Sequence, residues 1–160
     1  MTITKGDKLP DVKVMLGTPE GPQETQTGEL FAGKKTAFFA VPGAFTPTCS
    51  AKHLPGFVEH AEALAQKGVD QIVCMSVNDA FVMDAWAKDQ DAQGKVVMVA
   101  DGNGDFTKAL GLELDASGFG MGGRSQRFSM IVDDGTVAEL NVEQGGAYEV
   151  SSADYMLGQL

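Results

Sequence analysis

The sequence predicts a single α/β domain, residues 1–160, in which a mixed central sheet is flanked by helices. In the middle of the chain, apolar segments of strand length alternate with segments of helical periodicity. Near the C-terminus, two apolar segments flank the turn sequence at residues 133–135 (DDG), which is typical of a β-hairpin. Parallel strands joined by helices, followed by a hairpin, give a mixed sheet. No linker or internal repeat divides the chain, whose length suffices for one ordinary core.

The N-terminal part predicts peripheral elements and then a buried strand. Residues 3–16 end in an alternation of apolar and polar residues, which indicates a strand at the periphery. Residues 17–35 are rich in Gly, Pro, Thr and Glu, so we expect turns there, with a short strand near residues 24–25. The continuous apolar run at residues 36–41 (TAFFAV) predicts a buried strand.

A helical pattern follows over residues 50–65 and ends at Lys67-Gly68. Pro55 lies inside this pattern. Because proline has no N–H, it cannot bond the carbonyl of Ala51, and we expect the first turn of the helix to be kinked or offset.

The second half of the chain predicts two further buried strands, at residues 69–77 and 95–100. Between them, Asn78-Asp79 is expected to cap a helix that carries Trp86 on its apolar face. A short helix is predicted over residues 105–110. The remaining elements are the two hairpin strands, at residues 128–132 and 136–142, and a closing helix within residues 151–160.

Composition excludes several classes of partner. The chain has 22 acidic and 12 basic side chains, a formal net charge of −10, which argues against binding nucleic acid or an anionic membrane surface. No apolar run approaches the ~18 residues of a membrane span. The N-terminal segment lacks the apolar stretch of a signal peptide, so the cytoplasm is the expected compartment. Two cysteines in such a chain are more typical of redox or core thiols than of a structural disulfide.

Residues 41–50 (VPGAFTPTCS) are where we place the chemistry of the protein. Two prolines and a glycine stop the preceding strand, and Thr and Ser residues favour the start of a helix. Cys49 therefore falls at or just inside a helix N-terminus, which favours the thiolate. Thr46, three residues earlier, can direct its hydroxyl to the same place. An inert cysteine buried in a strand-to-helix turn fits this pattern equally well.

The same residues resemble the active-site motif of peroxiredoxins, in particular the type II or atypical subgroup. Further blocks similar to that subgroup follow in the same order, at residues 53–57 (HLPGF), 76–82 (SVNDAFV), 127–130 (RFSM) and 140–143 (LNVE). The resemblance implies a thioredoxin-like fold and a thiol-dependent peroxidase that reduces hydrogen peroxide and alkyl hydroperoxides through a cysteine sulfenic acid at Cys49. It also implies recycling by glutathione and glutaredoxin, or by thioredoxin, a homodimer, and no metal or other cofactor.

The resemblance implies catalytic roles for four residues: Cys49, Thr46, Pro42 and Arg127. Arg124 and Arg127 are the only arginines in the chain, and a cation beside the sulfur would favour the thiolate and stabilise charge on the peroxide. Position alone mildly favours Arg127, which opens a strand. The family motif also places the arginine there. Arg124 follows a glycine-rich stretch, so we expect a mobile, solvated charge.

Cys74 lies within an apolar strand sequence, and we favour an inert core thiol at this position. In plant-like members of the subgroup, a cysteine at this separation can resolve the sulfenic acid, and the alternative resolving position near the C-terminus is occupied here by Glu149 or its neighbours. A disulfide between Cys49 and Cys74 would require local unfolding unless their Cα atoms lay within about 7 Å. External thiols are therefore the expected reductants.

Other readings stay open at this point. His53 and His60 lie four and eleven residues after Cys49, an arrangement that a cysteine hydrolase or a metal site could use, although the ligand set is incomplete. A peroxide sensor that passes oxidation to a partner protein, and a binding module without activity, are the competing functions. Phe119 and Met121 lie on a glycine-rich loop, which is either an ordinary loop or an apolar lip that joins a second subunit.

Overall fold

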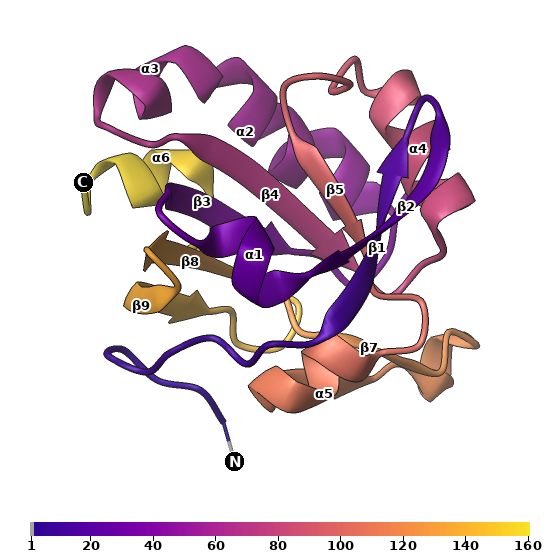
Figure 1. Cartoon of the computed structure of the whole chain (residues 1–160). Coiled ribbons are helices and arrows are strands. Elements are labelled where there is room, and N and C mark those ends of the chain that lie inside the picture. The colour runs from indigo at the N-terminus through magenta and orange to yellow at the C-terminus, as the bar shows by residue number, and fades with distance from the viewer. Residues whose placement is uncertain (1) are drawn as a thin grey trace.

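The computed structural model describes residues 2–160, which form a seven-stranded mixed sheet with helices on both faces (Figure 1). The strands of this sheet are β1 (Lys13–Thr18), β2 (Gly21–Gln26), β3 (Lys35–Ala40), β4 (Gln71–Ser76), β5 (Val97–Ala100), β8 (Phe128–Asp133) and β9 (Thr136–Val142). A separate two-stranded sheet consists of β6 (Glu113–Asp115) and β7 (Gly123–Ser125).

The helices are short. They are α1 (Thr27–Phe31), α2 (Leu54–Glu59), α3 (Ala61–Gln66), α4 (Ala80–Asp89), α5 (Asp105–Leu110) and α6 (Ala153–Leu157), with a π-helix η1 (Cys49–His53) and a 3₁₀-helix η2 (Ser117–Phe119). Over residues 2–160, no helix has the length and apolar character needed to cross a membrane.

The order of the strands is β2-β1-β5-β4-β3-β8-β9. The pairs β3–β4 and β4–β5 are parallel, and the other pairs are antiparallel. The predicted mixed sheet and the hairpin at residues 133–135 are therefore confirmed. The turn of the hairpin contains Asp134 at φ 49° and Gly135 at φ 79°, which are the left-handed conformations that a two-residue hairpin turn needs.

The register of the central strands determines which residues meet at one edge of the sheet. Ala40, the last residue of β3, pairs with Met75 of β4 in parallel and with Phe128, the first residue of β8, in antiparallel. The carboxyl ends of β3 and β4 and the start of β8 therefore lie together. The loop after β3 and Arg127, which immediately precedes β8, emerge from the same edge.

Two apolar cores lie on opposite faces of the sheet. On one face, side chains of η1, α2, α3, α4 and α6 pack against inward-facing residues such as Phe39 and Cys74. On the other face, Phe31 of α1 and Phe106 of α5 pack against Phe38 and its neighbours in the sheet. Alternate residues of β3 thus contact different cores, as the period of a strand requires.

The structure departs from the expected elements in three places, one of which is the separate β6–β7 sheet, which the sequence did not predict. Helix α1 forms within residues 17–35, where turns were expected, and buries Phe31. The helix expected over residues 50–65 is divided into η1, α2 and α3, with a break at His60. In η1, the N–H of Leu54 donates to the carbonyl of Cys49, a bond across five residues that takes up the offset imposed by Pro55.

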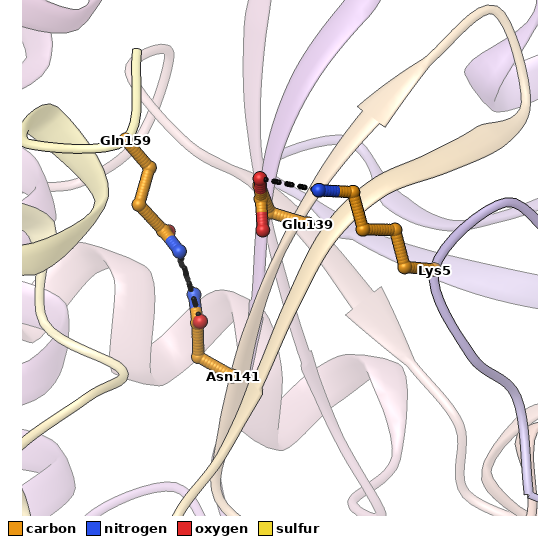
Figure 2. Close-up of polar contacts among 4 residues, drawn as sticks. All are labelled: Lys5, Glu139, Asn141 and Gln159. Atoms are coloured by element: carbon orange, nitrogen blue, oxygen red, sulfur yellow. Dashed lines mark hydrogen bonds and ion pairs between the residues drawn. The ribbon is translucent and has the colours of Figure 1, made fainter.

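Lys5, near the N-terminus, and Gln159, near the C-terminus, both contact side chains of β9, as Figure 2 shows. The ammonium group of Lys5 lies 3.0 Å from the carboxylate of Glu139. Farther along the strand, the side-chain amides of Asn141 and Gln159 exchange hydrogen bonds of 2.8 and 3.0 Å. The two amide hydrogen bonds hold the C-terminal segment against β9, at the edge of the sheet.

Candidate active site

The loop that follows β3 is held in shape by its own hydrogen bonds and by the next strand. The hydroxyl of Thr46 donates to the carbonyl of Gly43 at 2.6 Å. The side-chain oxygen of Asn78, just after β4, accepts a hydrogen bond from the N–H of Ala44 at 3.0 Å. Phe45 has φ 64°, a conformation that costs energy for a bulky residue and persists where surrounding contacts impose it. The loop is therefore strained but well anchored.

Cys49 lies in the first turn of the helical segment that begins at residue 47, close to where the sequence predicts it. Its side chain is completely buried and is a free thiol. At the start of a helix, unpaired N–H groups and the helix dipole stabilise nearby negative charge.

Arg127 reaches this sulfur from the start of β8. Its Nη2 donates to Cys49 Sγ at 3.0 Å, although 78 residues separate the two positions. The guanidinium of Arg127 also passes 6.0 Å from the centre of the Tyr148 ring. The structure thus brings together the cysteine and the arginine that the sequence singled out.

His53 contacts Arg127 and is not the partner of Cys49 that a hydrolase would need. Its Nε2 lies 2.8 Å from the carbonyl oxygen of Ser151, and its Nδ1 lies 2.8 Å from Arg127 Nη1. Since a carbonyl only accepts, Nε2 carries the proton and Nδ1 accepts from Arg127. Burial, and then the charge of Arg127, lower the pKa of His53 to about 3, so the imidazole is neutral at physiological pH.

Glu143 anchors the segment that contains the Ser151 carbonyl. Its Oε2 accepts from the N–H groups of Glu149, Val150 and Ser151 and from the Ser151 hydroxyl, at 2.6–2.9 Å. Burial would raise the pKa of Glu143, but these four hydrogen bonds outweigh burial and lower it. The sequence did not reveal this role, although Glu143 lies just beyond a strand and within the block at residues 140–143.

Arg124 differs from the mobile, solvated charge that we expected. Its side chain is half-buried, and Nε donates to the carbonyl of Met121 at 2.9 Å. Nη1 lies 3.4 Å from the carbonyl of Pro42. A Cβ atom at Gly43 would lie 3.1 Å from each of Arg124, Met121 and Thr46. Glycine at position 43 therefore allows the loop to pack closely against Arg124.

Cys74 occupies the interior of β4, between Phe39 of β3 and Met98 of β5. It is completely buried. Burial, and then the proximity of Cys49, raise the pKa of the Cys74 thiol well above its ordinary value. The predicted packing of Cys74 as a core residue is confirmed, and its thiol is a poor nucleophile in this conformation.

Trp86 is a further neighbour that the sequence did not connect with the site. Its indole Nε1 donates to the hydroxyl of Ser50 at 2.9 Å.

His60, by contrast, lies farther along the chain, bonded to Gly56 and paired with Asp154. Within the described part of the chain, no group of three or more His, Cys, Asp or Glu side chains is arranged to hold a metal ion.

The chemistry available to this arrangement is that of an activated thiol. A buried sulfur at a helix start, with a guanidinium at hydrogen-bond distance, is a nucleophile with a built-in group to stabilise negative charge. The Thr46 hydroxyl donates its hydrogen bond to the carbonyl of Gly43, so its oxygen can accept a hydrogen bond from a bound molecule.

Comparisons with known proteins agree with this chemistry. The Redoxin family matches residues 4–157. The chain is 53% identical to Peroxiredoxin-2E, chloroplastic, of Arabidopsis thaliana, over 99% of this chain and 70% of that protein. It is 51% identical to Peroxiredoxin-2B of the same plant, over 99% and 98% of the two chains. The structure of reduced Prx3 from Vibrio vulnificus in complex with H₂O₂ superposes with a TM-score of 0.94 at 52% identity, covering 99% of each chain.

Proposed function

Because this chain belongs to the peroxiredoxins of the Redoxin family and is a thiol-dependent peroxidase, we propose that Cys49 is the thiol that the peroxide oxidises. The observation that carries this assignment is the 3.0 Å contact between Arg127 Nη2 and Cys49 Sγ in the first turn of a helix. Both cysteines are buried, but Cys74 lies within β4 with a raised pKa, which leaves Cys49, bonded to Arg127, as the reactive thiol.

In the proposed reaction, the Cys49 thiolate attacks the terminal oxygen of the hydroperoxide. The S–O bond forms as the O–O bond breaks, so sulfur is oxidised to a sulfenic acid and the peroxide is reduced. The leaving alkoxide or hydroxide takes up a proton and departs as alcohol or water. Arg127 stabilises both the thiolate and the charge on the oxygens. Thr46 accepts a hydrogen bond from the peroxide, and Pro42 shields the sulfur from bulk water.

The proposed reductant is an external thiol, namely glutathione assisted by glutaredoxin, with thioredoxin as the alternative. A first thiol condenses with the sulfenic acid, which releases water and leaves a mixed disulfide at Cys49. Thiolate attack on that disulfide then regenerates Cys49. The burial of Cys74 inside β4 and its raised pKa support this route, because a buried, protonated thiol is a poor nucleophile toward the sulfenic acid.

Peroxiredoxins use the redox chemistry of cysteine itself, and we propose that this chain needs no metal, haem or flavin.

We also propose the cytoplasm as its compartment. Its two free thiols suit a reducing environment. One relative is chloroplastic by name, so subcellular fractionation of the native protein is the test of this point.

We further propose a homodimer, because large aromatic side chains are exposed on segments that adjoin the site. Phe45 is 51% exposed, Phe81 72% and Phe119 86%. The contact of Asn78 with Ala44 brings the start of α4, which carries Phe81, to the loop containing Phe45. An exposed apolar group of this kind is typical of an interface between subunits.

The assignment of Cys49 is tested with Cys49→Ser and, as its matched control, Cys74→Ala. Peroxide consumption is measured with glutathione and glutaredoxin, and separately with thioredoxin and its reductase. We expect Cys49→Ser to abolish turnover, because a serine hydroxyl stays protonated and cannot form a sulfenic acid. Substantial turnover in Cys49→Ser would overturn the assignment, and turnover with thioredoxin alone would overturn the proposed reductant.

A further inference from the structure

We propose that His53 is a positioning residue, which fixes the guanidinium of Arg127 against the sulfur of Cys49. The inference rests on the proposed function, in which Arg127 stabilises the thiolate and the developing charge on the peroxide. His53 itself does not touch the sulfur in the contacts that the structure records. It acts through the arginine.

The geometry of Arg127 supplies the first argument. Nη1 donates to His53 Nδ1 at 2.8 Å, and Nη2 donates to Cys49 Sγ at 3.0 Å. A planar guanidinium with two directional contacts has a defined orientation, whereas one contact leaves it free to swing. The nearby ring of Tyr148, 6.0 Å from Cζ, attracts the cation without giving it a direction. His53 is therefore the partner that sets the angle at which Arg127 meets the sulfur.

The second argument is that His53 is itself held rigidly. Its ring is fully buried and packs against Phe39 with centroids 4.7 Å apart, and edge-on to Tyr148 at 5.2 Å. The hydrogen bond from Nε2 to the Ser151 carbonyl fixes both the orientation of the ring and its tautomer. An acceptor lone pair at Nδ1 is then aimed permanently at Arg127.

The third argument concerns the support behind Ser151. The carboxylate of Glu143 binds both the N–H and the hydroxyl of Ser151, at 2.8 and 2.6 Å. Contacts therefore run without interruption from Glu143, just beyond β9, through Ser151 and His53 to Arg127. Filling the core requires only the packing of the ring. The acceptor Nδ1 that faces the cation of Arg127 is not needed for packing, so it indicates a further role for His53.

The experiment measures the second-order rate constant for oxidation of Cys49 by hydrogen peroxide in His53→Phe, His53→Gln and Arg127→Gln. His53→Phe keeps an aromatic ring and removes both nitrogen atoms. His53→Gln restores one donor and one acceptor. His60→Phe, at the other histidine of the chain, is the matched control. His53→Leu replaces His53→Phe if the larger ring prevents folding, which unfolding curves of each variant reveal.

We expect His53→Phe to lower the rate constant about tenfold, because misplacement of a group near the reacting atoms costs rate steeply. His53→Gln recovers most of the loss, and His60→Phe stays within about twofold of the wild type. The double variant His53→Phe, Arg127→Gln reacts no more slowly than Arg127→Gln alone, because the histidine acts only through the arginine. A role in stability alone would give neither rescue by glutamine nor this lack of additivity.

The outcomes separate the inference from the proposed function. If Arg127→Gln reacts as fast as the wild type, the proposed role of Arg127 is wrong. If Arg127→Gln is slow but His53→Phe is not, the positioning role is overturned while the proposed function stands. The same holds if His53→Phe lowers the rate constant by the same factor in the wild type and in Arg127→Gln. Failure of His53→Gln to recover the rate also overturns it.

Discussion

The indole nitrogen of Trp86 donates a 2.9 Å hydrogen bond to the hydroxyl of Ser50, the residue that follows Cys49. Trp86 comes from α4, is completely buried, and is the only tryptophan in the chain. The bond therefore ties α4 to the π-helix that carries Cys49. It also makes tryptophan fluorescence a direct report on the surroundings of Cys49.

Substitution of Ser50 by Ala should destabilise the protein, because the indole N–H would be left buried without an acceptor. We expect the free energy of unfolding to fall by ~1–3 kcal/mol. Urea denaturation followed by Trp86 fluorescence measures this loss. The control is Ser117→Ala, which alters an exposed serine and should change stability by no more than ~0.5 kcal/mol. Equal stability of Ser50→Ala and the wild type would show that the hydrogen bond contributes nothing.

Conservative substitution of the two arginines should have unequal effects on peroxide reduction. Arg127→Lys loses the planar pair of donors that joins Cys49 to His53, and we expect the rate to fall ~10–100-fold. Arg124→Lys disturbs only the contacts with Met121 and Pro42, and should stay within about threefold of the wild type. Stopped-flow measurement with hydrogen peroxide compares the two. Similar losses in both variants would contradict our choice of Arg127.

Removal of the Cys74 thiol should leave turnover with glutathione and glutaredoxin largely intact. Cys74→Ser buries a hydroxyl inside the sheet without a hydrogen-bond partner, so we expect the free energy of unfolding to fall by ~1–3 kcal/mol. Cys74→Ala, which adds no polar group, separates that penalty from any role in catalysis. Mass spectrometry after one equivalent of peroxide should show oxidation at Cys49. Rapid formation of a Cys49–Cys74 disulfide, with loss of turnover in both variants, would establish a two-cysteine cycle instead.

Stability should decrease as the pH falls below about 6.5, because of His53. Its pKa is about 3 in the folded protein against 6.5 ordinarily, so between these values the unfolded chain binds a proton that the folded protein does not. The free energy of unfolding then falls by up to ~1.4 kcal/mol per pH unit, or about 2 kcal/mol from pH 7 to pH 5. Denaturation curves at both pH values measure the change. In His53→Gln this part of the decrease should vanish, and an unchanged decrease would refute the assignment to His53.

The sequence by itself determined the main strands of the sheet and the position of Cys49 at a helix start. Continuous apolar runs identify β3, β4 and β5 because strands in the middle of a parallel sheet are buried on both faces. The turn at residues 133–135 specifies the β8–β9 hairpin. The proline- and glycine-rich loop before Cys49 places that residue at a helix start, since these residues end the strand locally. Such signals lie within a few positions of one another in the chain.

Only the tertiary structure decided which distant side chains complete the site. The sequence favoured Arg127 over Arg124, but the contact of Arg127 with Cys49 depends on the pairing of Ala40 with Phe128, a long-range register that no local pattern contains. The neutral state of His53 depends on burial and on Arg127, 74 residues away, and its tautomer depends on the carbonyl of Ser151, 98 residues away. The bonds from Glu143 to residues 149–151 and from Trp86 to Ser50 likewise join separate elements. Hydrogen bonds between side chains follow from packing, and packing is a property of the folded chain as a whole.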